Sequence, residues 1–315
     1  MLRIPALIIL LSTSAIGPAV AETPKVITDI APIQSLVARV MQGVGTPDVL
    51  LPPGASPHEF ILRPSDADRL AQAGLIIWVG HGLTPWLEEP VETLAPDAAK
   101  LELLDTTGWT ALQARADSAF AEEEHEEAEG EAGHDHEHAL SGIDPHAWLD
   151  PSNAAVFMTL IAQALASADP ANAAAYTANA TTAQGEMASL KAETLALLAP
   201  YAGGTYITPH DAYQYFEVAF GMPATGAISL TDAATPGPAR IAELQDKVAS
   251  GAVTCVLTDP QTSPEWSQVL RDGSVARTAF VDPDGGSQAA GLGSVAELYP
   301  AIIRQIASGL VSCLK

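Results

Sequence analysis

Short apolar runs alternate with amphipathic segments over the first half of the chain. The runs predict strands at Lys25–Asp29, Asp48–Leu51, Leu75–Val79 and Leu101–Leu104. Helical spacing of apolar residues predicts helices near Ile33–Val44, Ser65–Ala73 and Thr84–Leu94. Ser65, after Pro64, is the expected N-cap of the second helix. Strands that alternate with helices indicate βαβ units and therefore a mainly parallel sheet.

The same alternation returns in the last third of the chain. Strands are predicted at Thr205–Thr208, Ala224–Ile228, Val253–Thr258 and Ala276–Val281. Helices are predicted near Ala212–Phe220, Pro238–Ala249, Pro264–Arg271 and Ser294–Leu310. The pattern thus indicates an α/β protein of two lobes, each with a four-stranded sheet. Ligands commonly bind between such lobes and at the C-terminal ends of parallel strands.

Between the lobes the sequence turns helical for about fifty residues. Asp150-Pro151 places an N-cap before a proline at the first helical position, and this helix should reach about Ala168. Asp169-Pro170 repeats the signal for a longer helix to Leu198. Its apolar face is predicted to consist of Tyr176, Ala180, Ala183, Met187, Leu190 and Leu197. At 1.5 Å per residue it would span roughly 43 Å, as a rigid connection between the lobes.

Residues 110–143 interrupt the alternation. Few branched apolar residues follow Leu112, and Glu, Ala, Gly and His dominate, so the segment cannot bury enough surface to offset its ordering entropy. We predict a mobile loop over about residues 113–142. It carries four of the eight histidines, His125, His134, His136 and His138. Imidazoles interleaved with carboxylates on a flexible chain favour weak, exchangeable metal binding, although a solvated acidic spacer is the alternative.

The N-terminus has the pattern of a secretory signal. Arg3 precedes an apolar run, and Ala19-Val20-Ala21 predicts cleavage after Ala21. A membrane anchor is the alternative, but the run is short for a span of roughly 20 residues. No cysteine follows the cleavage site, which excludes lipid attachment there. We therefore expect residues 1–21 to be removed and a soluble, exported protein, with lobes at 22–149 and 201–315 and connecting helices at 150–200.

Charge and cysteine content narrow the function further. The formal charge of −24 argues against a nucleic-acid partner, because a polyanion would be repelled. Nine of the 38 acidic residues lie between Glu122 and Glu137, yet the rest still outnumber the 14 basic ones. In an oxidising compartment the two cysteines, Cys255 and Cys313, most simply form a disulfide, and two buried free thiols are the alternative.

Three histidines lie in comparable settings outside the loop. His58, His146 and His210 each follow a proline and lie at a predicted strand or helix boundary. Singly each would more often be a structural or surface histidine, but together they predict one metal site. Three neutral imidazoles suit Zn²⁺, and a carboxylate commonly completes the shell. His81, in Gly80-His81-Gly82, is expected to lie outside this site.

The fourth ligand is left open by the sequence. Asp282 directly follows the last predicted strand and is the first choice, although an Asp-Pro turn is its alternative role. Glu59, Asp284, Asp211 and a bound water are the other options.

Several stretches together resemble the periplasmic zinc-binding proteins of high-affinity zinc ABC importers, the ZnuA-like proteins. The resembling segments are GASPHEF with LRPSD at residues 54–66, DPHAWLDP at 144–151, HDAYQYF at 210–216, and DPQ at 259–261. The acidic histidine-rich loop and the paired cysteines also match, and the resemblance spans the mature chain. Where some zinc-type members have an acidic ligand before the first histidine, this chain has Pro57.

The resemblance implies two lobes, one long connecting helix and a metal ion between the lobes. It carries over His58, His146 and His210 as ligands, with Asp282 at the position of an acidic ligand in many members. It implies a monomeric binding protein, not an enzyme, that delivers Zn²⁺ to an inner-membrane ABC permease, with a periplasmic metallochaperone as a further candidate partner. A zinc hydrolase, which would need an open metal position and a general base, is the rival from another class. A metal buffer or adhesion protein is the third reading.

Overall fold

The computed structural model describes residues 23–120 and 142–315. Its first sheet has the order β2-β1-β3-β4, with all strands parallel. The strands are β1 (Val26–Thr28), β2 (Asp48–Val49), β3 (Leu75–Trp78) and β4 (Ala99–Glu102). The predicted parallel sheet is confirmed, although β4 begins and ends two residues before the predicted strand.

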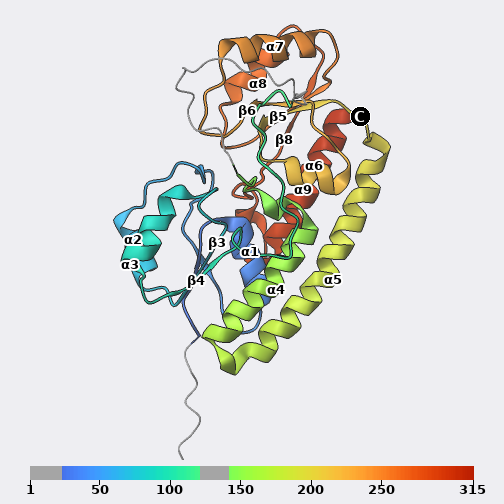
Figure 1. Ribbon diagram of the computed structural model, residues 1–315. Coiled ribbons are helices and arrows are strands. Elements are labelled where there is room, and N and C mark those ends of the chain that lie inside the picture. The colour runs from blue at the N-terminus through green and yellow to red at the C-terminus, as the bar shows by residue number, and fades with distance from the viewer. Residues whose placement is uncertain (1–22, 121–141) are drawn as a thin grey trace, which may run out of the picture.

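Helices cover both faces of this sheet because its strands are apolar on both sides. The helices are α1 (Ala31–Val40), α2 (Pro64–Ala71) and α3 (Glu88–Leu94), the last preceded by the 3₁₀ turn η1 (Pro85–Leu87). Along β3, Leu75 and Ile77 pack with α1, whereas Ile76 and Trp78 pack with α2 and α3. In Figure 1, α2 and α3 lie on the side of the lobe away from α4 and α5.

The start of α2 differs from the prediction. Arg63, not Ser65, is the N-cap, and Pro64 is the first helical residue. Proline has no N–H to lose at that position and its fixed φ suits the first turn, so the helix begins two residues earlier than a cap at Ser65 would allow. The Asp66 carboxylate accepts the Arg63 backbone N–H at 3.2 Å and closes the turn.

The second sheet repeats the first, in the order β6-β5-β7-β8 and again parallel. Its strands are β5 (Tyr206–His210), β6 (Gly226–Ser229), β7 (Cys255–Thr258) and β8 (Arg277–Phe280). Its helices are α6 (Gln214–Phe220), α7 (Pro238–Ala249), α8 (Pro264–Arg271) and α9 (Leu298–Leu314), with the 3₁₀ turns η5 (Ala289–Gly291) and η6 (Val295–Glu297) before α9. β5 runs two residues further than predicted, so His210 is its last residue.

Two antiparallel helices, α4 (Pro151–Ala168) and α5 (Ala173–Leu198), run along one side of the molecule (Figure 1). The 3₁₀ turns η2 (Ala147–Leu149), η3 (Pro170–Asn172) and η4 (Ala199–Tyr201) flank them. Asp150 caps α4 as predicted, accepting the Ser152 N–H at 2.8 Å. The predicted apolar face of α5 is wrong at its end: Leu197 is 42% exposed, and Leu198 is buried instead. The face therefore continues through Thr194 to Leu198.

The lobes are fastened to each other and to the connecting helices. α9 packs against β7, β8 and α5 and also reaches α1 of the first lobe. The Tyr299 backbone N–H donates to Ser35 Oγ at 2.9 Å, and its hydroxyl donates to the Trp148 carbonyl at 2.7 Å. The predicted disulfide is confirmed, joining Cys255 on β7 to Cys313 on α9. Within the described ranges, no helix is long and apolar enough to cross a membrane.

Candidate metal centre

Three histidines from distant parts of the sequence lie together between the lobes. His58 is in the loop after β2, His146 directly precedes η2, and His210 ends β5. The ring centroids of His58 and His146 are 5.5 Å apart, and those of His146 and His210 are 5.9 Å apart. The fold thus brings together the three histidines that the sequence singled out.

Local hydrogen bonds hold the His58 loop in place. Ser56 Oγ accepts the backbone N–H groups of His58 and Glu59, both at 3.2 Å. Trp86 Nε1 donates to the Pro57 carbonyl at 2.8 Å, which ties this loop to η1. These bonds fix the main chain at His58, so its imidazole is presented from a short, anchored turn.

Carboxylates orient the other two imidazoles. Asp144 Oδ1 lies 2.8 Å from His146 Nδ1, and Asp259 Oδ2 lies 3.0 Å from His210 Nδ1. Asp259 is itself held by the backbone N–H of Thr262 at 2.8 Å. A carboxylate on Nδ1 favours the tautomer whose Nε2 lone pair is free, an arrangement that metal-binding histidines commonly share. Asp144 and Asp259 therefore act as orienting partners.

The protonation of the three rings differs because their surroundings differ. Burial, together with the neighbouring imidazoles, lowers the pKa of both His58 and His146 to about 3. Burial also lowers the pKa of His210, but the hydrogen bond and charge of Asp259 and the charges of Asp232 and Asp284 outweigh it, so that this pKa rises to about 9. Two of the three rings are thus neutral at pH 7, the form that binds metal.

The residues fit a zinc ion in chemistry and approximately in spacing. Two imidazoles on one tetrahedral Zn²⁺, with Zn–N distances of about 2.0–2.1 Å, place their ring centres roughly 5 Å apart. The observed 5.5 and 5.9 Å are slightly wider. Accordingly, within residues 23–120 and 142–315 no three His, Cys, Asp or Glu side chains are already arranged to hold a metal. Small side-chain rotations close gaps of this size, so the spacing of the rings is compatible with a shared ion.

Two ring nitrogens of the histidine cluster also lack partners. Nε2 of His58 and Nε2 of His146 are buried, and neither has a hydrogen-bond partner among the described residues. A buried polar atom left unpaired costs roughly 1–3 kcal/mol, so such atoms usually have an occupant in the working state. A bound cation would satisfy both lone pairs.

The carboxylates expected as fourth ligand have other contacts. Asp282 is fully buried, and its oxygens accept backbone N–H groups from Asp284, Gly285 and Ser287 at 3.2, 2.9 and 2.7 Å. This is the turn-forming role that the Asp-Pro sequence offered as an alternative. Asp284 accepts from Gln261 Nε2 at 3.0 Å.

The two remaining acidic candidates, Asp211 and Glu59, lie in other environments. Asp211 pairs with Arg115 at 2.6 Å, and Glu59 is exposed. A carboxylate already neutralised by arginine, or one surrounded by water, is a weaker candidate for a buried metal shell than one without a partner.

One acidic residue near the site was missed by sequence reasoning. Asp232 lies in the β6–α7 loop, and both of its carboxylate oxygens are buried without a partner among the residues that the structure describes. A signal was present: Asp232 follows a predicted strand closely, as His58 and His210 do. It was hidden because Thr231 and Ala233 around it resemble an ordinary turn.

The remaining histidines lie either at the surface or outside the described residues. His81 is 63% exposed and lies 2.7 Å from Glu88, outside the histidine cluster as expected. His125, His134, His136 and His138 lie outside the described residues. Both ends of the segment predicted as a loop belong to the described residues. Gln113 and Ile143 form an antiparallel bridge next to Asp144.

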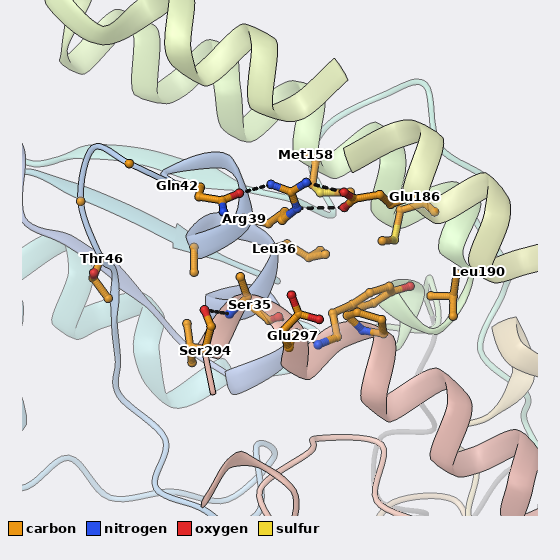
Figure 2. A pocket seen from close by; sticks show the side chains of 18 of the residues that line it. Ser35, Leu36, Arg39, Gln42, Thr46, Met158, Glu186, Leu190, Ser294 and Glu297 are labelled. Carbon is orange, nitrogen blue, oxygen red and sulfur yellow. Dashed lines mark hydrogen bonds and ion pairs between the residues drawn. The ribbon is translucent and has the colours of Figure 1, made fainter. Parts of the chain in front are cut away.

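A larger cavity of about 550 Å³ lies elsewhere, between α1, α5, η6 and α9. Figure 2 shows Arg39 in its wall, bonded to Gln42 and Glu186, with Glu297 nearby. Its lining contains neither histidine nor cysteine. The side chains that suit a transition metal are therefore those of the histidine cluster, and the larger cavity lacks them.

Two α/β lobes with parallel sheets, a long connecting helix and histidines that meet between the lobes define the class of two-lobed, metal-binding solute-binding proteins. More specifically, the chain belongs to the family described as zinc-uptake complex component A, periplasmic, whose model matches residues 26–313. Members of this family are solute-binding components of a transport system and not enzymes.

Individual relatives are similar over nearly the whole chain. The high-affinity zinc uptake system protein ZnuA of Paracoccus denitrificans is 38% identical, covering 96% of this chain and 95% of the relative. The protein of the same name from Brucella abortus is 37% identical, covering 93% and 92%. A crystal structure of ZnuA superposes with a TM-score of 0.76 at 20% identity, covering 93% of this chain and 100% of that one. The last similarity supports the fold.

Proposed function

We propose that this protein captures Zn²⁺ at the cluster of His58, His146 and His210 and delivers it to an ABC permease for uptake. One observation carries the assignment: the buried Nε2 atoms of His58 and His146 have no partner in the described structure, and the His58 and His210 rings lie 5.5 and 5.9 Å from the His146 ring. Three imidazoles favour Zn²⁺ over Mg²⁺ or Ca²⁺, which prefer oxygen ligands. Zn²⁺ is the cargo here.

Release of the ion would involve small loop shifts, not wide hinge opening. Trp148 Nε1 donates to the Pro283 carbonyl at 3.1 Å, which joins the segment after His146 to the second lobe. At Gly286 an added Cβ would lie 3.0 Å from Pro53 Cα, so the His58 loop packs closely on the loop after β8. A shift of the His58 loop would remove one ligand while the lobes stay fastened.

The histidine-rich segment would serve as a feeder. Its four histidines lie outside the described residues, but the adjoining chain runs beside the site. Arg115 pairs with Asp211, the neighbour of His210, and with Glu217 at 2.7 Å. Ions held weakly on such a segment would be concentrated near the cleft.

Export and partners complete the proposal. Residues 1–21, outside the described residues, act as a signal peptide cleaved after Ala21. The mature protein works in the periplasm as a monomer, with the permease as its essential partner and a metallochaperone as an additional source of zinc. Capture of a permease by the zinc-loaded protein from solubilised membranes tests the partner, and absence of any transporter subunit would contradict it.

Alanine variants of the three histidines test the site. His58→Ala, His146→Ala and His210→Ala should each weaken zinc binding at the tight site at least tenfold, because each removes a proposed direct ligand. His81→Ala is the matched control and should bind as the wild type. Competition calorimetry with a chelator, with native mass spectrometry for stoichiometry, measures both. Unchanged tight binding in all three variants would contradict the assignment of these histidines as zinc ligands.

A further inference from the structure

The β6–α7 loop carries a carboxylate that has no hydrogen-bond partner among the described residues. Both oxygens of Asp232 are buried without a hydrogen-bond partner among residues 23–120 and 142–315. Burying a carboxylate without a partner is costly, and proteins normally pair such groups or use them to bind a cation. Asp232 therefore resembles His58 and His146, whose buried Nε2 atoms are also without partners.

Strand register places this carboxylate at the histidines. In the parallel β5–β6 pair, His210 lies opposite Ser229. Asp232 follows only three residues later, at the C-terminal edge of the same sheet. Ser229 Oγ donates to the Thr231 carbonyl at 2.8 Å, which turns the loop over this edge. Leu230 also lines a small cavity together with His146, so the loop reaches the second histidine as well.

The charge of Asp232 acts on all three imidazoles. It is near enough to interact electrostatically with the rings of His58, His146 and His210. Asp232 is therefore an acidic group close to all three rings.

We propose that Asp232 is the carboxylate ligand that completes the zinc site. The inference rests on the proposed function, because it presumes zinc at the three histidines. It replaces Asp282, whose oxygens already accept three backbone N–H groups. Three imidazoles and one carboxylate make a closed four-coordinate shell, which suits binding without catalysis.

The test compares Asp232→Asn with Asp282→Asn in the full mature protein. Asparagine keeps the size of the side chain and removes its charge. Asp232→Asn should lower zinc affinity at least tenfold and alter the visible absorption of bound Co²⁺, while the metal-free protein stays folded because the size of the side chain is kept. Asp282→Asn should leave the Co²⁺ spectrum unchanged and lower the melting temperature, because it disturbs a turn.

Different outcomes test the Asp232 assignment and the histidine site separately. If Asp232→Asn leaves affinity and spectrum unchanged while His146→Ala abolishes tight binding, the Asp232 assignment is wrong and the histidine site stands. If Asp282→Asn alone alters the Co²⁺ spectrum, Asp282 is the ligand. Tight binding that survives His58→Ala, His146→Ala and His210→Ala would overturn the histidine site and with it the role of Asp232.

Discussion

Asp144 Oδ1 contacts His146 twice, accepting its backbone N–H at 3.0 Å and lying 2.8 Å from its Nδ1. One oxygen thus fixes both the main chain and the ring of the middle histidine. Asp259 has the corresponding place beside His210, at 3.0 Å from Nδ1. Two of the three proposed ligands are therefore oriented by a buried carboxylate before any ion arrives.

Removing an orienting carboxylate should weaken zinc binding without removing a ligand. We expect Asp144→Ala and Asp259→Ala each to lower zinc affinity about 10–100-fold, the usual effect of losing such a partner. Glu88→Ala is the matched control, since Glu88 forms the same kind of pair with the exposed His81 at 2.7 Å. Chelator competition would measure the three affinities. Equal affinities for Asp259→Ala and Glu88→Ala would show that orientation contributes nothing.

Deleting residues 122–138 should separate weak from tight binding. The variant loses four histidines and nine acidic residues, while all residues of the proposed tight site remain. Native mass spectrometry should show fewer zinc ions per chain at high zinc, and calorimetry should show one unchanged tight site. Loss of the tight site instead would place ligands in the deleted segment.

The fold was predictable from sequence because its signals are local and repeated. Buried strands such as Leu75–Trp78 are continuous apolar runs, and Asp150-Pro151 is an unambiguous helix start. Errors occurred where two local preferences competed. Pro64 occupies the first helical position of α2, so the N-cap is Arg63 and not Ser65. On α5, Leu197 and Leu198 both fit an apolar face, and only packing selected Leu198.

The candidate site was less predictable for a physical reason. Each of the three histidines has a recognisable local setting, so spacing and resemblance identified them. The role of a carboxylate depends on which donors reach it in three dimensions. Asp282 precedes a proline and a turn, and the turn's own N–H groups occupy its oxygens. Asp232 is distinguished by the absence of such donors within the described chain, which no local pattern reveals.

The disulfide should stabilise the second lobe and leave zinc binding intact. Cys255 and Cys313 are separated by 58 residues and join β7 to α9, away from the histidines. Chain-entropy arguments give roughly 4 kcal/mol for closing a loop of that length. The double variant Cys255→Ala/Cys313→Ala should lower the free energy of unfolding by up to about that amount. Urea denaturation measures this; a zinc affinity changed more than a few-fold would contradict an exclusively structural role.

Asp29 should make the stability of the metal-free protein depend on pH. It lies at the end of β1, and its carboxylate accepts backbone N–H groups from Ile30 and Val79, both at 2.8 Å. Burial raises its pKa to about 6 despite these bonds. In the unfolded chain the pKa is about 3.9, so the folded state binds the proton more tightly. The resulting stabilisation is full below about pH 4 and is lost as pH rises through about 6.

The change between the two limits is about 3 kcal/mol, because each pKa unit corresponds to about 1.4 kcal/mol. Asp29→Asn cannot titrate, so the difference in unfolding free energy between wild type and variant should shift by up to about that amount, against the wild type, from pH 4.5 to 8. Other buried carboxylates with raised pKa, Asp144 and Asp211, occur in both proteins and largely cancel in the difference. Urea denaturation across this range, with zinc removed by chelator, supplies both curves. A difference independent of pH would mean that Asp29 does not change its protonation on unfolding, and that its three acceptor contacts, including Thr84 Oγ1 at 3.4 Å, fully offset its burial.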